Sequence, residues 1–118
     1  MLVVRGDIVE AGLVRADAAR FARRFTDVEW TGVSGYYAAD DAEVDVVCQT
    51  KLSQFPTVAV FTRADLTAAG IDIKATFRTP HVTLASATVE LVVERLVRCP
   101  HAQHRNPYYE AETTEEGR

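Results

Sequence analysis

The chain has 118 residues and a mass of 13.0 kDa, which is the size of one domain. Its 47% hydrophobic and 25% charged residues are typical of a globular protein, and they exclude a wholly disordered chain, a collagen-like repeat and a disulfide-dense scaffold. The formal net charge of −4 and the pI of about 5.3 argue against a chain that is basic throughout, as many nucleic-acid binders are.

Hydrophobic periodicity and turn residues predict nine elements. In chain order they are a strand over 2–4, a helix over 16–25, a strand over 33–38, a helix from Asp41 to about Lys51, a strand over 57–61, a helix over 63–69, strands over 71–77 and 81–85, and a helix over 87–98. Asp40, Thr62 and Ser86 are the predicted N-caps, and Gly70 is placed for a left-handed residue after the third helix. Arg20, Arg23 and Arg24 lie off the apolar face of the first helix, where we expect them to be solvated.

This order of elements predicts an α+β fold: a single two-layer domain, with one mixed sheet of about five short strands packed with three to four helices. We expect the globular domain to cover residues 1–109. The last segment, residues 110–118, contains four Glu and one Arg and is predicted to be a disordered acidic tail.

The sequence predicts a cytoplasmic protein that does not enter membranes. It has no apolar run near the roughly 18–20 residues that span a bilayer, and its first residues become charged too early for a secretory signal. We therefore expect Cys48 and Cys99 to be reduced thiols. Eleven Arg against two Lys, with abundant Ala and Val, are typical of a protein from a GC-rich bacterial genome.

A first catalytic candidate lies in the segment Arg78-Thr79-Pro80-His81-Val82-Thr83-Leu84. On a strand, His81 and Thr83 point to the same face, and an imidazole beside a hydroxyl can hold a phosphate and move a proton. His81-Val82-Thr83-Leu84 resembles the His-x-Thr-x motif of two-histidine phosphoesterases, which use two such motifs. This chain carries one, because neither His101 nor His104 has a Thr or Ser two residues later. The alternative is a strand end with an edge His and a β-favouring Thr.

A second candidate pairs Arg5, on the first strand, with the segment Gly35-Tyr36-Tyr37-Ala38. The pair resembles part of the site of ADP-ribosyltransferases. That resemblance implies contact of Arg5 with NAD, stacking of Tyr36 on nicotinamide, and a late Glu, here Glu110, that stabilises the transition state. The alternative is an exposed strand-edge Arg beside an aromatic pair that contributes one ring to the core.

The segment Cys99-Pro100-His101-Ala102-Gln103-His104 contains one thiol and two imidazoles, which are residue types that bind zinc. A closed zinc site needs four ligands, and Cys48 is expected on a different helix. A half-buried Cys followed by a polar turn explains these residues without metal. Nucleotide-binding and metalloprotease motifs are also missing from the sequence, so we predict no metal and no cofactor.

The charges are distributed unevenly along the chain. Residues 1–47 have nine acidic and five basic side chains (−4), residues 48–109 have four and seven (+3), and residues 110–118 have four and one (−3). All three histidines lie in the basic part. If its arginines converge in space, Arg78, Arg98 and Arg105 are candidates to bind an anionic ligand, such as a nucleotide, RNA or an acidic protein surface.

The leading interpretation is a small accessory or partner-binding module of a bacterial operon, of the toxin–antitoxin type or specific to its operon, that binds a protein partner or forms a homo-oligomer. Small size, no complete catalytic set and a polarised charge pattern favour it. The alternative is an enzyme that acts on a nucleotide or RNA, either around His81 and Thr83 or around Arg5 and Tyr36.

Overall fold

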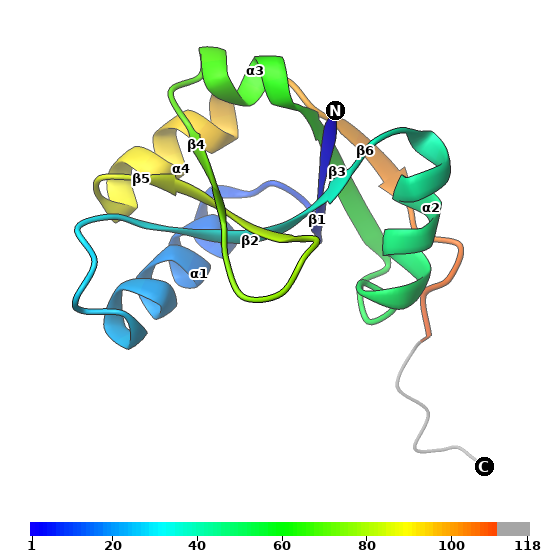
Figure 1. The fold of residues 1–118 in the computed structure, drawn as a ribbon, viewed down its shortest axis with the longest axis horizontal. Coiled ribbons are helices and arrows are strands. Elements are labelled where there is room, and N and C mark those ends of the chain that lie inside the picture. Colours follow the sequence, from blue (N-terminus) through cyan, green and yellow to red (C-terminus); the bar gives the residue numbers. More distant parts are fainter. Residues whose placement is uncertain (111–118) are drawn as a thin grey trace.

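The computed structural model describes residues 1–110 and contains six strands and four helices (Figure 1). In chain order these are β1 (Leu2–Gly6), α1 (Ala11–Arg24), β2 (Thr31–Ala38), α2 (Asp41–Thr50), β3 (Thr57–Thr62), α3 (Arg63–Ala68), β4 (Asp72–Ala75), β5 (His81–Ser86), α4 (Val89–Arg98) and β6 (Ala102–Arg105). The predicted α+β fold of one compact domain is confirmed.

The strands form a single sheet in the order β4-β5-β2-β1-β3-β6, in which every neighbouring pair is antiparallel. The predicted sheet of about five mixed strands is therefore corrected to six antiparallel strands. An alternation of strands and helices does not fix strand direction. If the connection brings the chain back to the same end of the sheet, the next strand is antiparallel. If the connection crosses to the opposite end, the next strand is parallel.

Two apolar clusters lie on opposite faces of the sheet, as the alternation of side chains along β1 requires. Val3 belongs to the larger cluster, which α1, α3 and α4 cover with Val14, Leu66 and Leu96 among others. Val4 belongs to the smaller cluster, which α2 covers with Val47 and Cys48. Figure 1 shows α2 alone on its side, and it packs on β2 and β1, so it covers only part of that face.

Helix boundaries follow their caps, with two corrections to the sequence-based expectations. Asp40 and Thr62 cap α2 and α3 as predicted, and Gly70 has the expected positive φ of 86°. Thr88, rather than Ser86, caps α4, because Ser86 is still part of β5. The first helix begins at Ala11, with the Glu10 side chain accepting a hydrogen bond from the Gly12 amide.

The C-terminal segment contains a strand that the sequence does not predict. β6 pairs with β3 at the edge of the sheet, and all four of its residues are exposed. A short edge strand with both faces in solvent has no apolar alternation to reveal it. Of the predicted acidic tail, only Glu110 is described, and its amide donates to the carbonyl of Ser53 at 2.9 Å; residues 111–118 lie outside the described part.

Within residues 1–110, none of the helices has the length and apolar character that crossing a bilayer requires.

Candidate functional site

The central strands β1 and β2 separate part-way along their length, and a cleft opens where they diverge. They pair only from Leu2↔Ala38 to Val4↔Tyr36, whereas β1 stays paired with β3 as far as Gly6. The cleft has a volume of about 560 Å³, which is within the range of about 300–1,000 Å³ for small-molecule sites.

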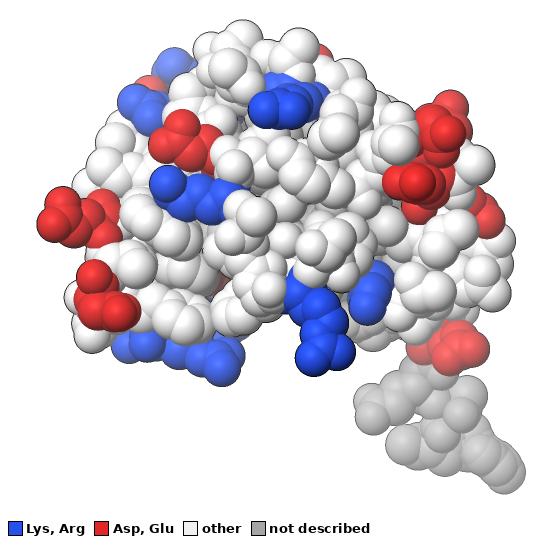
Figure 2. Space-filling view, in the orientation of Figure 1, with Lys and Arg blue, Asp and Glu red and all other residues white. Residues whose placement is uncertain are grey.

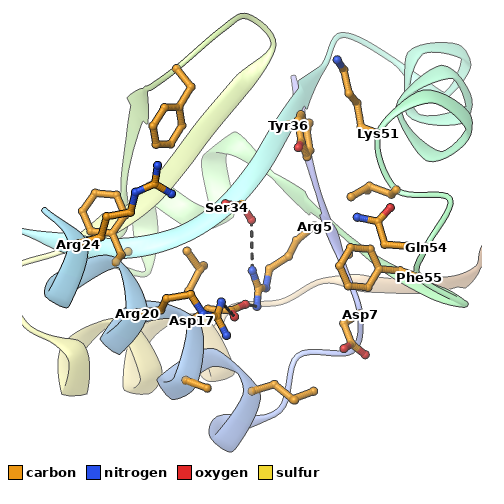
Figure 3. Close-up of a pocket in the computed structure, with 18 of the residues that line it drawn as sticks. Arg5, Asp7, Asp17, Arg20, Arg24, Ser34, Tyr36, Lys51, Gln54 and Phe55 are labelled. Carbon is orange, nitrogen blue, oxygen red and sulfur yellow. Dashed lines mark hydrogen bonds and ion pairs between the residues drawn. The ribbon is translucent and has the colours of Figure 1, made fainter.

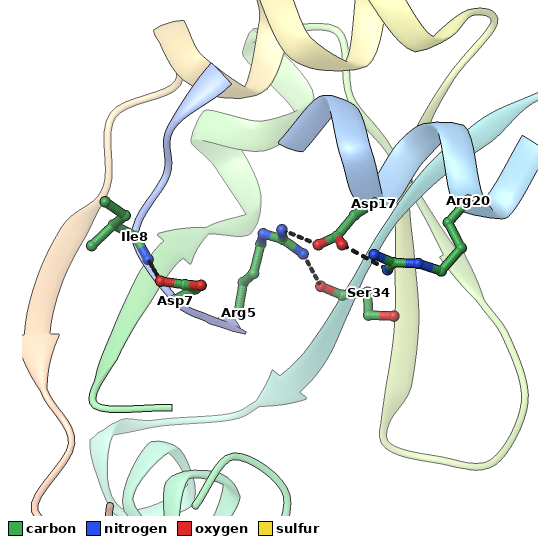
Figure 4. Close-up of polar contacts among 6 residues, drawn as sticks. All are labelled: Arg5, Asp7, Ile8, Asp17, Arg20 and Ser34. Atoms are coloured by element: carbon green, nitrogen blue, oxygen red, sulfur yellow. Dashed lines mark hydrogen bonds and ion pairs between the residues drawn. The ribbon is translucent and has the colours of Figure 1, made fainter. Parts of the chain in front are cut away.

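Arg5 lies at the point of divergence and is 4% exposed. Its Nη1 donates to the backbone oxygen of Ser34 at 3.3 Å, and its Nη2 donates to Oδ2 of Asp17 at 2.5 Å (Figure 4). Its Nε is the only buried side-chain polar atom of the described residues that has no hydrogen-bond partner. A buried cation with an unused donor is rare in folded proteins.

Asp17, on α1, connects this buried arginine to the surface. It accepts from Arg5 and, through Oδ1, from Nη1 of Arg20 at 2.8 Å. Burial by itself raises the pKa of the Asp17 carboxyl, but the hydrogen bonds and charges of Arg5 and Arg20 outweigh burial, and the net effect lowers that pKa. The Asp17 carboxylate is therefore ionised at neutral pH and fixes the orientation of Arg5.

The cleft lining is positively charged although the whole chain is negative. Four cationic residues and two acidic residues line it, a local formal charge of +2. Figure 3 shows Arg20 and Arg24 of α1 on one side and Lys51 and Gln54, after α2, on the other, with Arg5 and Ser34 between them. Figure 2 shows Lys and Arg side chains in separate groups along the lower edge of the molecule.

An aromatic wall, which we define as Phe21, Phe25 and Phe77, forms one apolar part of the lining. Phe21 and Phe25 are adjacent at the end of α1, with ring centroids 4.6 Å apart, and the Phe25 ring lies 5.8 Å from that of Phe77. The Arg24 guanidinium carbon lies 5.2 Å from the Phe25 centroid. The cationic and aromatic parts of the lining are therefore in contact.

The loop 52–55 closes the side of the cleft opposite α1, and a residue far along the chain holds it. Asn106 is buried and donates through Nδ2 to the carbonyls of Leu52 at 2.8 Å and Phe55 at 3.1 Å. The Phe55 ring packs so closely on Gly6 that a Cβ at Gly6 would lie 2.3 Å from it. Glycine is therefore required at this end of β1.

Of the four catalytic candidates, the structure brings Arg5 and Tyr36 into the cleft lining, whereas His81 and Thr83 do not line it. His81 contacts the Tyr36 ring edge-on, with centroids 5.2 Å apart. Glu110, the candidate late Glu, contacts the neighbouring loop through its amide and is also outside the lining.

His81 and Thr83 do share one face of β5, as the strand spacing predicts. The hydroxyl of Thr76 joins them, at 2.9 Å from Nδ1 of His81 and 2.8 Å from Oγ1 of Thr83. Thr83 is 1% exposed, and burial lowers the pKa of His81 despite the hydrogen bond with Thr76. This network connects β5 to the start of the β4–β5 turn and leaves the Thr83 hydroxyl out of reach of a ligand.

The other two histidines, which are also described, lie far from His81. His104 is on β6, and three strands separate β6 from β5, a distance of about 19 Å at the usual strand spacing. His101 packs on Phe61, with ring centroids 5.3 Å apart, and its Nδ1 lies 3.0 Å from the Cys99 carbonyl oxygen. Neither can act on the same phosphate as His81.

The three arginines predicted to bind an anion do not converge. Arg78 lies in the β4–β5 turn, Arg105 lies on β6 at the opposite edge of the sheet, and Arg98 ends α4 and pairs with Glu94 at 3.4 Å. The cationic cleft instead uses Arg20 and Arg24, which the sequence assigned to solvent. Their spacing of four residues places them on one helical face, which is a sequence property that could have identified them.

The segment Cys99–His104 forms no metal centre in the described part of the chain, where no three His, Cys, Asp or Glu side chains are grouped. Both cysteines are buried, and burial raises the pKa of the Cys99 thiol to about 11. They contribute to the core rather than to a reactive site.

Comparison with protein-family models, with curated protein sequences and with solved structures gave no match.

Proposed function

We propose that the protein is a binding module whose ligand or partner presents an anionic group, such as a phosphate or a carboxylate, to the cleft between β1 and β2. The observation that carries this proposal is the cationic lining of the cleft, in which the buried guanidinium of Arg5 lies beside Arg20, Arg24 and Lys51.

An anion in the cleft gains from the net positive charge of the lining. Arg5 is paired with Asp17, so the excess charge of +2 comes from Arg20, Arg24 and Lys51 against Asp7. Arg24 and Lys51 are exposed at the rim and can form charge-assisted hydrogen bonds with the same anion. The net charge of −4 does not oppose this, since a cleft with a local charge of +2 attracts anions over short distances.

The test uses inorganic pyrophosphate as the probe and compares two neighbouring arginines. Arg24 lines the cleft, whereas Arg23 is exposed on the same helix and does not line it. We expect saturable binding of pyrophosphate in an NMR titration, an increase of Tm at saturating probe, and an affinity at least fivefold lower in Arg24→Ala than in the wild type.

Arg23→Ala is the matched control, since it removes the same charge one residue away, and it should keep the wild-type affinity within twofold. Sodium chloride at equal ionic strength controls for general screening. The proposal would be overturned if Arg23→Ala and Arg24→Ala lost equal affinity for pyrophosphate, or if the NMR chemical shifts never saturated. Either result would show that the probe responds to net charge only.

A second candidate function is catalysis on a nucleotide, and it rests on the presence of Arg5 and Tyr36 in one cleft. In the version that resembles ADP-ribosyltransferases, millimolar NAD should raise Tm, and nicotinamide should be released at a rate that falls at least tenfold in Tyr36→Ala. If NAD bound but no nicotinamide were released, the cleft would be a binding site and not a catalytic site for NAD.

A further inference from the structure

Phe77 combines two unfavourable features in one residue of the described chain. Its side chain is 68% exposed, and its backbone has a φ of +57°, in the left-handed region that bulky residues rarely adopt. Each feature has a free-energy cost, and glycine at this position would remove both. A locally unfavourable residue in the lining of a cleft is a reason to look for a role in binding.

The Phe77 ring is held in place although most of it is exposed. Its centroid lies 5.0 Å from that of His81, at an interplanar angle of 69°, and 5.8 Å from that of Phe25, at 52°. His81 is in turn held by its hydrogen bond to Thr76. A supported ring with free surface gives a stacking site that loses little side-chain entropy when a ligand binds.

The ring and the cationic groups belong to the same cleft. Phe77 lines it together with Arg5 and Arg24, and Arg24 contacts the Phe25 ring next to Phe77. A volume of about 560 Å³ gives space for one aromatic heterocycle with a sugar and a phosphate. An inorganic anion or an aliphatic carboxylate would leave the aromatic wall without a partner.

We propose that the ligand is a free mononucleotide, with its phosphate among Arg5, Arg20 and Arg24 and its base stacked on Phe77. This inference rests on the proposed anion-binding function and adds the chemical class of the ligand. Stacking on an aromatic side chain accepts any base, because every base has a π-face, so the cleft should discriminate weakly among bases.

The test separates stacking from phosphate binding with four probes: AMP, UMP, ribose 5-phosphate and adenosine. We expect AMP to bind about tenfold more tightly than ribose 5-phosphate, the increment of one stacked base. UMP should bind within about fivefold of AMP, and adenosine should bind at least tenfold more weakly than AMP because it lacks the phosphate.

Phe77→Ala should lower the affinity for AMP to that of ribose 5-phosphate and leave the affinity for ribose 5-phosphate unchanged within twofold. Phe77→Tyr, which keeps the ring, should retain the tenfold preference for AMP. Tyr109→Ala is the control, since Tyr109 is an exposed aromatic residue outside the cleft lining. The Tm of each variant verifies that it is folded.

The outcomes distinguish this inference from the function on which it rests. If ribose 5-phosphate and pyrophosphate bind but AMP binds no more tightly, the mononucleotide inference is overturned and anion binding stands. If none of the phosphate-containing probes binds, both fail. Binding of a six-residue oligoribonucleotide much more tightly than its mononucleotide would overturn the free mononucleotide in favour of an RNA strand.

Discussion

At the scale of single residues, Arg5 and Asp17 form the most buried ion pair among the described residues, with side chains 5% and 34% exposed. Removing one member of such a pair leaves the other charge without compensation in a place that water scarcely reaches. We expect Asp17→Asn to lower the free energy of unfolding at pH 7 by about 2–3 kcal/mol, measured by urea denaturation. Asp27→Asn, which removes an equal charge from an exposed loop position, should change it by less than about 0.5 kcal/mol.

The same pair predicts a pH dependence with a defined sign. The pKa of Asp17 is lower in the folded protein than its ordinary value of 3.8, so the ionised carboxylate stabilises the fold. This contribution is fully present above pH 3.8 and is lost as the pH falls through the lower folded pKa. Urea titrations from pH 7 to pH 3 should therefore show a wild-type advantage over Asp17→Asn that is constant down to about pH 4 and then shrinks. A difference that grows in acid would contradict the assignment of the ion pair.

At the scale of elements, the segment after β6 determines the shape of the cleft through one buried amide. Asn106 satisfies the carbonyls of Leu52 and Phe55 and accepts from the Tyr108 amide at 3.0 Å. Asn106→Ala leaves two backbone oxygens of loop 52–55 without these donors and should cost about 2–3 kcal/mol of unfolding free energy. Hydrogen exchange should accelerate at the amide of Phe55, which donates to Leu52 within that loop.

Gln103→Ala on β6 is the control for this variant. Gln103 is exposed, and its side chain has no hydrogen bond to the described residues. Stability and Phe55 exchange should both stay at the wild-type level. If Asn106→Ala destabilised the protein without faster exchange at Phe55, Asn106 would support the fold in general rather than the cleft loop.

At the scale of the whole molecule, two apolar clusters on opposite faces of one sheet should unfold together. Cys99 lies in the cluster under α1 and α4, and Cys48 lies in the cluster under α2. Both thiols are buried and have raised pKa values, so alkylation requires opening of the structure. Under increasing urea, iodoacetamide should label both cysteines at the same midpoint, coincident with the loss of circular dichroism. Labelling of Cys48 at a lower urea concentration would show that α2 and its cluster open independently.

The fold was largely predictable from local patterns. Strands β1, β3 and β5 are apolar runs bounded by turn residues, and Asp40 and Thr62 cap α2 and α3 through contacts a few residues apart. The strand directions were not predictable, nor was β6. Both depend on how distant segments pack. Neither produces a periodic pattern of apolar residues that the sequence would reveal.

The candidate site was predictable only in its separate residues. Arg5 and Tyr36 were singled out, but by resemblance to a motif, whereas what places them in one cleft is the early end of the β1–β2 pairing. The charge distribution pointed to the basic segment 48–109. Most of the cationic lining comes instead from β1 and α1, which lie in the acidic segment 1–47. The local electrostatic potential depends on which charges are close in space, and not on which are close in the sequence.

The sequence by itself determined what short-range chemistry decides: one domain of α+β type, the starts of α2 and α3 at their caps, and the apolar faces. The tertiary structure alone decided the order and direction of the strands, the pinning of loop 52–55 by Asn106 and the cleft in which Arg5 meets the aromatic wall. Each of these joins residues far apart in the chain, and their contacts are specified by packing and pairing that no local window contains.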